Sequence, residues 1–185
     1  MAFKSPIATT AQHGVMRVGA GLTSVDGLVS TNPVALFDQG YFYDTTTQTN
    51  PVASVVNLTS FDSLAVNVGI TLVAGTQLTV SKTANYNLQF SVQLDKTSGP
   101  QASVDIWLRK NGIADYPDTN TSLVLIGSNA VLLAGWSYLL ALNAGDYVEI
   151  AWQSPDTTVR LLAKPTQVGP TRPVTPSARC TIVQL

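Results

Sequence analysis

The segment Asn85–Asp95, NYNLQFSVQLD, places apolar and polar side chains on strictly alternate positions. This period of two is typical of a β-strand with one buried face, because successive side chains of a strand point to opposite sides of the sheet. The polar face carries amides, a hydroxyl and one carboxylate, with no reactive group in evidence. We therefore interpret the strand as a wall of a sandwich rather than as part of a catalytic site.

Similar segments follow one another from Leu36 to the end of the chain, with turn residues between them. The dipeptide Asn111-Gly112, which is typical of two-residue hairpin loops, ends the alternating segment ASVDIWLRK. Residues 130–142, AVLLAGWSYLLAL, also fit a helix, but Gly135 and the strand-like DYVEI after a two-residue turn favour a strand pair. Short strands at such spacing predict an all-β, antiparallel sandwich with little or no helix.

Several aromatic side chains fall outside the face that this alternation assigns to the core. Trp107 points away from the apolar residues of its strand, Trp136 and Tyr138 share one face of theirs, and Tyr147 lies opposite the apolar set that follows it. Aromatic residues are enriched at protein interfaces, so we expect these four at the contact between subunits. The alternative is a thick sandwich, or a register that differs from the one assumed.

Residues 1–35 differ from the rest, with scattered single apolar residues among Gly, Ser and Thr. Such a segment lacks the material for a core of its own. We predict an extended N-terminal attachment arm over residues 1–35 and one domain over residues 36–185. The apolar side chains expected to enter pockets of a neighbour, or to add strands to its sheet, are Phe3, Ile7, Val15, Val18, Leu22 and Leu28.

Charge is scarce in this chain. Charged residues make up 11% of the sequence, against about 25% in ordinary globular proteins, and the net charge is −1. This balance argues against a nucleic-acid-binding surface, which requires clustered Lys and Arg. Because 45% of the residues are hydrophobic, disorder does not explain the deficit. Either neighbouring molecules cover much of the surface, or the protein works outside a cell.

Groups that carry chemistry are few. His13 is the single histidine and Cys180 the single cysteine, which excludes a Ser-His-Asp or Cys-His set within residues 36–185 and any internal disulfide. We therefore expect a protein that is not an enzyme and binds no cofactor. The N-terminus lacks a signal-peptide pattern, and no apolar run approaches membrane-spanning length, so we expect a soluble protein made in the cytoplasm and not bound to membrane.

The loop NGIADYPDTNTS gathers Asp115, Asp118, Asn120 and Thr121. Such oxygen ligands suit Ca²⁺, but the loop lacks the glycine and terminal glutamate of an EF-hand. Asp, Asn, Thr and Pro are also the residues that turns use to bond their own backbone. We therefore predict a turn here and no metal. Glu149 has no evident second carboxylate for glycosidase chemistry.

The segments NYNLQFSVQLDKTSG, VDIWLRKNG and LNAGDYVEIAWQS resemble the jelly-roll domains of tumour-necrosis-factor-like and complement-like proteins. Together with GYFYDTTTQTNP and PTRPVTPSARCTIVQL, they are more similar still to jelly-roll domains in virion proteins of tailed bacteriophages. Within the arm, GVMRVGAGLTSVDGLVS is similar to short Gly-Leu-rich segments of phage fibre and decoration proteins. The resemblance implies an antiparallel jelly roll and a compact homotrimer.

No long shaft precedes the domain, so we expect a decoration or cement protein on the outer capsid rather than a fibre tip. Its partners would be the major capsid protein or other virion proteins, and its place the virion surface after synthesis in the host cytoplasm. The alternative is a receptor- or glycan-binding tip of a head fibre, tail fibre or spike. A depolymerase is disfavoured because paired carboxylates are lacking.

Overall fold

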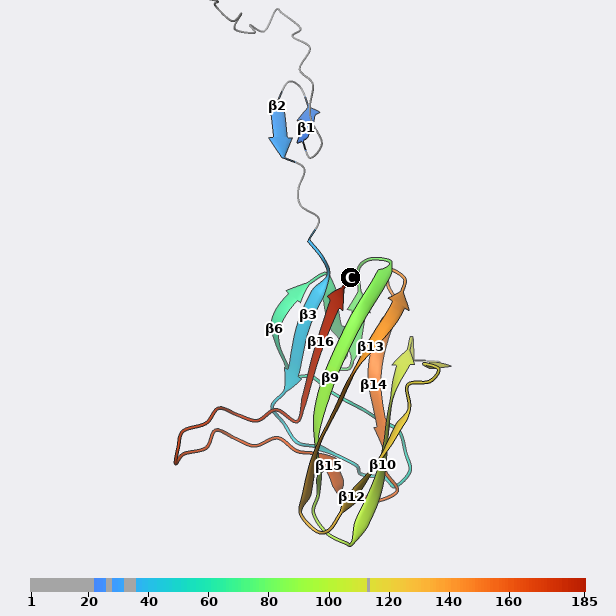
Figure 1. Ribbon diagram of the computed structural model, residues 1–185, viewed down its shortest axis with the longest axis vertical. Helices are drawn as coiled ribbons and strands as arrows, with labels where there is room; N and C mark the ends of the chain where they lie inside the picture. The colour runs from blue at the N-terminus through green and yellow to red at the C-terminus, as the bar shows by residue number, and fades with distance from the viewer. Residues whose placement is uncertain (1–21, 26–27, 32–35, 113) are drawn as a thin grey trace, which may run out of the picture. The chain divides into compact units, whose positions relative to one another are not determined.

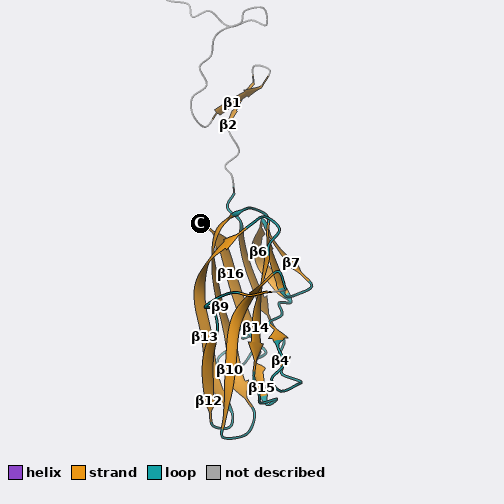
Figure 2. Ribbon diagram, turned by 90° about the vertical axis from the view of Figure 1, so that its right-hand side faces the viewer, coloured by secondary structure: helices purple, strands orange, loops and turns teal. Residues whose placement is uncertain are grey.

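The computed structural model describes residues 22–25, 28–31, 36–112 and 114–185. The chain divides into two compact units, residues 1–35 and residues 36–185. Within the described residues every regular element is a β-strand (Figure 2). The described residues therefore contain no helix that is long and apolar enough to cross a membrane.

The jelly roll is defined by how its principal strands pair. In chain order the first pairs with the last, the second with the next to last, and so on inward, each pair antiparallel, which is the path of a ribbon wound into a double sheet. The pairs are β3 (Gln39–Asp44) with β16 (Ala178–Gln184), β8 (Gln77–Val80) with β14 (Tyr147–Gln153), β9 (Ala84–Lys96) with β13 (Ala130–Leu142), and β10 (Gln101–Lys110) with β12 (Thr121–Ile126). The all-β jelly-roll prediction is therefore confirmed.

These strands form two sheets, one containing β3, β16, β9 and β13 and the other β8, β14, β10 and β12 (Figures 1 and 2). Further strands extend the two sheets. They are β4 (Gln48–Thr49), β6 (Ser63–Val68) and β15 (Val159–Leu161) in the first sheet, and β5 (Asn57–Leu58), β7 (Ile70–Val73) and β11 (Ala114–Asp115) in the second.

The core lies between the sheets, and β9 shows how the sequence builds it. Its apolar positions from Tyr86 to Leu94 are all buried, whereas the polar residues between them are exposed or half-buried. The strand therefore closes one side of the sandwich, as its alternation predicts. The largest fully buried side chains include Trp152, Tyr86 and Phe42, which come from three different strands.

Residues 130–142 form one continuous strand, not a helix, but its partner is not the one that the sequence suggested. All 13 residues of β13 pair with β9, and β14 pairs with β8 and β10 in the opposite sheet. The predicted pair of β13 with the following strand is therefore wrong. The turn at residues 143–146 carries the chain from one sheet to the other and does not close a hairpin.

The part of the arm that the structure describes is a small antiparallel pair, β1 (Leu22–Val25) and β2 (Leu28–Thr31). Leu22 pairs with Thr31, and Val25 with Leu28. The sequence between the strands is Asp26-Gly27, a dipeptide typical of two-residue hairpin loops. This hairpin was not predicted, because residues 1–35 were expected to form an extended arm.

Candidate functional site

Alternation along β10 decides which of its side chains meet water. Ala102, Val104, Ile106 and Leu108 are buried, and the residues between them, Trp107 included, are half-buried on the outer face of the sheet. The prediction that Trp107 points away from the core is therefore confirmed. A tryptophan on that face leaves a large apolar ring available to a ligand.

The hairpin after β10 brings a carboxylate to this ring. Asn111 and Gly112 have φ angles of 53° and 66°, the left-handed conformations that a tight hairpin turn requires. The chain then returns as β11, which sets Asp115 opposite Arg109. The Trp107 indole Nε1 donates to Asp115 Oδ1 at 2.7 Å, and Arg109 Nε lies 3.6 Å from the same oxygen.

The loop from Tyr116 to Asn120 is fastened to the sandwich by Thr119, which is buried. The backbone N–H of Leu108 donates to Thr119 Oγ1 at 3.1 Å, and this hydroxyl donates to the Tyr116 carbonyl at 2.8 Å. The Tyr138 hydroxyl donates to the Thr119 carbonyl at 2.8 Å. The loop is therefore held in place before any ligand arrives.

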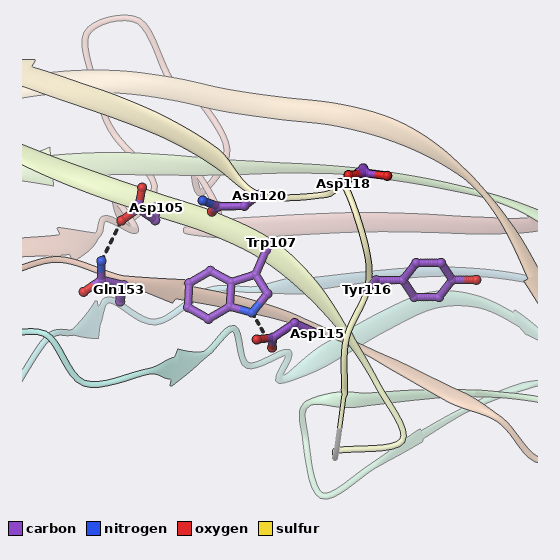
Figure 3. A pocket seen from close by; sticks show the side chains of 7 residues that line it. All are labelled: Asp105, Trp107, Asp115, Tyr116, Asp118, Asn120 and Gln153. Carbon is purple, nitrogen blue, oxygen red and sulfur yellow. Dashed lines mark hydrogen bonds between the residues drawn. The ribbon is translucent and has the colours of Figure 1, made fainter.

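Together these elements enclose an open pocket of about 720 Å³. Gln153 Nε2 donates to Asp105 Oδ2 at 2.6 Å on neighbouring strands, and in Figure 3 the indole ring lies between Asp105 and Asp115. The lining residues are Asp105, Trp107, Asp115, Tyr116, Asp118, Asn120 and Gln153. The lining thus combines two aromatic side chains with carboxylates and amides, and it includes no Lys or Arg.

The hairpin at this end of the sheet depends on Asp146. Its carboxylate accepts hydrogen bonds from Asn111 Nδ2 and from the Asn143 backbone N–H, both at 2.8 Å, and lies 2.7 Å from Lys110 Nζ. The Asn111 hydrogen bond, supported by those of Lys110 and Asn143, lowers the pKa of Asp146 from 3.8 to about 2. A carboxyl group whose pKa is lower in the folded than in the unfolded state stabilises the fold at pH values above its unfolded-state pKa.

We expect Asp146→Asn to reduce the free energy of unfolding by about 1–2 kcal/mol at neutral pH, because the charge-assisted bonds are lost. The deficit should shrink as the pH falls from about 4 to about 2, where the wild-type carboxyl also becomes neutral. Urea unfolding of both proteins across this range measures the difference. An equal deficit at neutral and acid pH would show that the charge of Asp146 contributes nothing.

The other aromatic residues expected at a subunit contact occupy different surroundings. Trp136 and Tyr138 pack against the hydrophobic core, and the Trp136 ring lies 5.4 Å from that of Phe90. This corrects the expectation that they point away from the core. Tyr147 is half-buried and its backbone bonds to Asn111. Contact of any of these residues with a second subunit stays a prediction.

The outer face of β13, on the side opposite Trp136, was missed. Its side chains Val131, Leu133 and Leu139 are 51%, 67% and 75% exposed. The signal was present in the sequence, because these residues have the opposite parity to Trp136 in a strand of 13 residues.

The remaining candidates offer little chemistry. Phe3, Ile7, His13, Val15 and Val18 lie outside the described residues, and Leu22 and Leu28 lie in β1 and β2. Cys180 is buried, which raises the pKa of its thiol and disfavours the reactive thiolate. Glu149 is buried beside Thr76, whose hydroxyl donates to it at 3.1 Å.

The described residues include no group of three or more His, Cys, Asp or Glu side chains arranged to hold a metal ion. Of the four residues considered for Ca²⁺, Asp115, Asp118 and Asn120 line the pocket, whereas Thr121 begins β12.

No family model matches the sequence, and no curated protein matches it. Among solved structures, the chain is similar to the tumour necrosis factor Eiger from S. frugiperda, with 15% sequence identity and a TM-score of 0.49. The match covers 80% of this chain and 92% of that chain. It carries no conclusion about function, and the jelly-roll assignment stands on the strand pairing itself.

Proposed function

We propose that this chain is a structural protein of a bacteriophage virion. It forms a homotrimer that decorates the capsid and stabilises the shell, and residues 1–35 attach it. Three features support the proposal: the jelly-roll fold, the sequence resemblance to phage virion domains, and the low charge of 11%. Self-association is the step on which the rest depends.

The observation that carries self-association is the outer face of β13. Natural edge strands are protected by charges, prolines, bulges or short length. β13 runs for 13 residues without a charge or a proline, exposes Leu133 and Leu139, and pairs with no described strand other than β9. An edge strand with such exposed apolar side chains is an aggregation hazard unless another molecule covers it. A second copy of the chain, repeated around a closed ring, covers each face in turn.

The trimer would stabilise the shell by mass action. Three arms on one rigid body bind together far more tightly than one arm alone, because the second and third attachments are intramolecular. A protein that binds the assembled lattice and not its dissociated subunits stabilises the lattice. The arm would bind by adding strands to a neighbour's sheet, a mode in which backbone hydrogen bonds supply the affinity.

Deleting residues 1–35 should leave the melting transition of the jelly roll unchanged and abolish attachment to undecorated particles. The two units are separately compact, and every described residue of the hydrophobic core lies within residues 36–185, so the deletion leaves the core complete. Calorimetry and co-sedimentation with particles measure the two properties. Normal binding by the truncated trimer would place the attachment surface on the jelly roll and refute the arm as the anchor.

A second candidate function is a receptor-binding tip of a fibre or spike, which the pocket beside Trp107 favours. The two functions differ in stoichiometry, because a decoration protein occupies many lattice positions and a tip occupies few. Copy number in the intact particle therefore separates them.

A further inference from the structure

We propose that the pocket beside Trp107 is a carbohydrate-binding site for neutral sugars. This inference goes beyond the proposed function, because a site on the jelly roll can bind sugar whether the domain lies on the capsid or at the tip of a fibre. It rests on three properties of the pocket: an outward-facing aromatic ring, fixed polar groups around it, and the sign of the charge.

The ring provides the apolar surface. A pyranose whose hydroxyls lie in the plane of the ring presents a flat face of C–H groups, which packs on an aromatic face and leaves the hydroxyls free at the rim. Trp107 lies on the outer face of the sheet, and its Nε1–H is already bound to Asp115 at 2.7 Å. The polar edge of the indole is therefore satisfied, and its orientation is fixed. Tyr116 also lines the pocket, but it is partly buried against the core, so Trp107 provides the outward-facing aromatic ring.

The polar groups around the ring are partly used and partly free. Asp105 uses Oδ2 to accept from Gln153, and Asp115 uses Oδ1 to accept from Trp107. Among the described residues, the second oxygen of each carboxylate accepts no hydrogen bond from another side chain and can accept one from a ligand hydroxyl. Because these internal bonds fix the side chains, their ordering costs little on binding. Asn120 and Asp118 extend the rim from the anchored loop.

The charge of the lining selects the class of sugar. Three carboxylates without a lining Lys or Arg repel uronic and sialic acids, so the ligand is not anionic. An organic cation would suit the carboxylates and the indole face. However, a cationic group offers no acceptor to the NH₂ group of Asn120, and the Asp115 carboxylate is already near Arg109 at 3.6 Å. A sugar hydroxyl both donates and accepts, as this mixture of groups requires.

The test is equilibrium binding of sugars to the purified chain. Calorimetry measures the affinity, and the NMR signal of the Trp107 indole N–H reports where the sugar binds. The probes are cellotetraose and chitotetraose as neutral sugars, a heparin tetrasaccharide as an anionic sugar, and a hexa-arginine peptide as a cation. We expect a neutral sugar to bind and to shift the indole signal, and the heparin probe not to bind. Trp107→Ala should weaken binding by roughly tenfold or more, the effect of removing one aromatic anchor.

Asn120→Ala, in the exposed rim, gives a second variant that does not alter the sheet and should also weaken binding. Tyr41→Ala is the matched control, because it removes an aromatic side chain from the outer face of the opposite sheet. Absence of neutral-sugar binding at millimolar concentration would overturn the proposal, as would equal binding by wild type and Trp107→Ala. Binding of the arginine peptide in place of sugar would assign the pocket to a cationic partner.

The sedimentation of Trp107→Ala separates this site from the subunit contact. We expect it to sediment like the wild-type protein, whereas the subunit contact that the sequence suggested for Trp107 predicts a smaller species. A smaller species would place Trp107 between subunits and overturn the sugar site. Because the readout is binding by the free protein, failure here leaves the capsid proposal intact, and failure to attach to particles leaves this site intact.

Discussion

Replacing Leu133 and Leu139 together by glutamate is expected to convert the proposed trimer to a monomer at micromolar concentration. The two side chains are 67% and 75% exposed in the single chain, so the change adds charge to the outer face without disturbing the core. Burying a leucine contributes about 1.5–3 kcal/mol, and the double variant also leaves charges buried at each contact. The loss per contact therefore exceeds about 3 kcal/mol, which corresponds to a dissociation constant raised by more than about a hundredfold.

Analytical ultracentrifugation measures this change, and far-UV circular dichroism shows whether the monomer keeps its β-structure. The matched control is Val168→Glu, which adds the same charge at a residue 85% exposed on the ribbon that projects between β15 and β16 (Figure 1). The control should remain a trimer. If the double variant also remains a trimer, the contact lies elsewhere, and the aromatic residues expected from the sequence become the next candidates.

The second large effect is expected from Asp38, which is 1% exposed just before β3. Its carboxylate accepts from the Ser81 backbone N–H at 3.2 Å, from Ser81 Oγ at 2.7 Å and from the Tyr86 hydroxyl at 3.1 Å, and it pairs with Lys82 Nζ at 3.0 Å. Burial alone raises the pKa of Asp38, but these hydrogen bonds outweigh it, so the pKa lies below its ordinary value. The carboxylate therefore ties the start of the domain to the turn between β8 and β9.

The same carboxylate requires glycine at position 69. A Cβ at that residue would lie 2.0 Å from Asp38 Oδ1, and its φ of 69° disfavours any side chain. Gly69 therefore packs closely against the Asp38 carboxylate, and truncation of the Asp38 side chain would leave a space beside it.

Asp38→Ala should lower the free energy of unfolding by about 2 kcal/mol, because it removes a buried charged acceptor that bonds the buried Tyr86 hydroxyl, Ser81 and Lys82. Asp62→Ala is the matched control. That carboxylate also accepts two hydrogen bonds, from the Thr45 backbone N–H and hydroxyl, but it is exposed, so water replaces it and the loss should stay below about 1 kcal/mol. Urea unfolding of both variants gives the comparison. Similar losses of stability in the two variants would mean that burial does not increase the contribution of the Asp38 hydrogen bonds to the free energy of unfolding.

The elements that could be predicted from the sequence are those whose signal is local. The alternation in β9 specifies its buried face, and Asn111-Gly112 specifies the hairpin that returns Asp115 toward Trp107. Asp38 has the same parity as buried Phe42, so its position also indicates an inward side chain, but alternation alone does not distinguish a buried carboxylate from a polar residue that precedes the strand.

What could not be predicted depends on which strands become neighbours. Alternation assigns faces but not partners, so β13 was expected beside β14 rather than beside β9. Gln153 enters the pocket because β14 lies next to β10 in the register that pairs it with Asp105, a relation across 48 residues of chain. A binding surface made from several strands is therefore visible only after the sheet is assembled.

The central proposal is that the protein is a trimeric decoration on the virion capsid. Electron microscopy of the intact particle, with three copies of the jelly roll fitted to its surface density, tests it most directly. The proposal predicts threefold density of this size at many equivalent positions of the shell, joined to the lattice by the arm. Density for only a few copies, confined to the tip of a fibre or the tail, would contradict it.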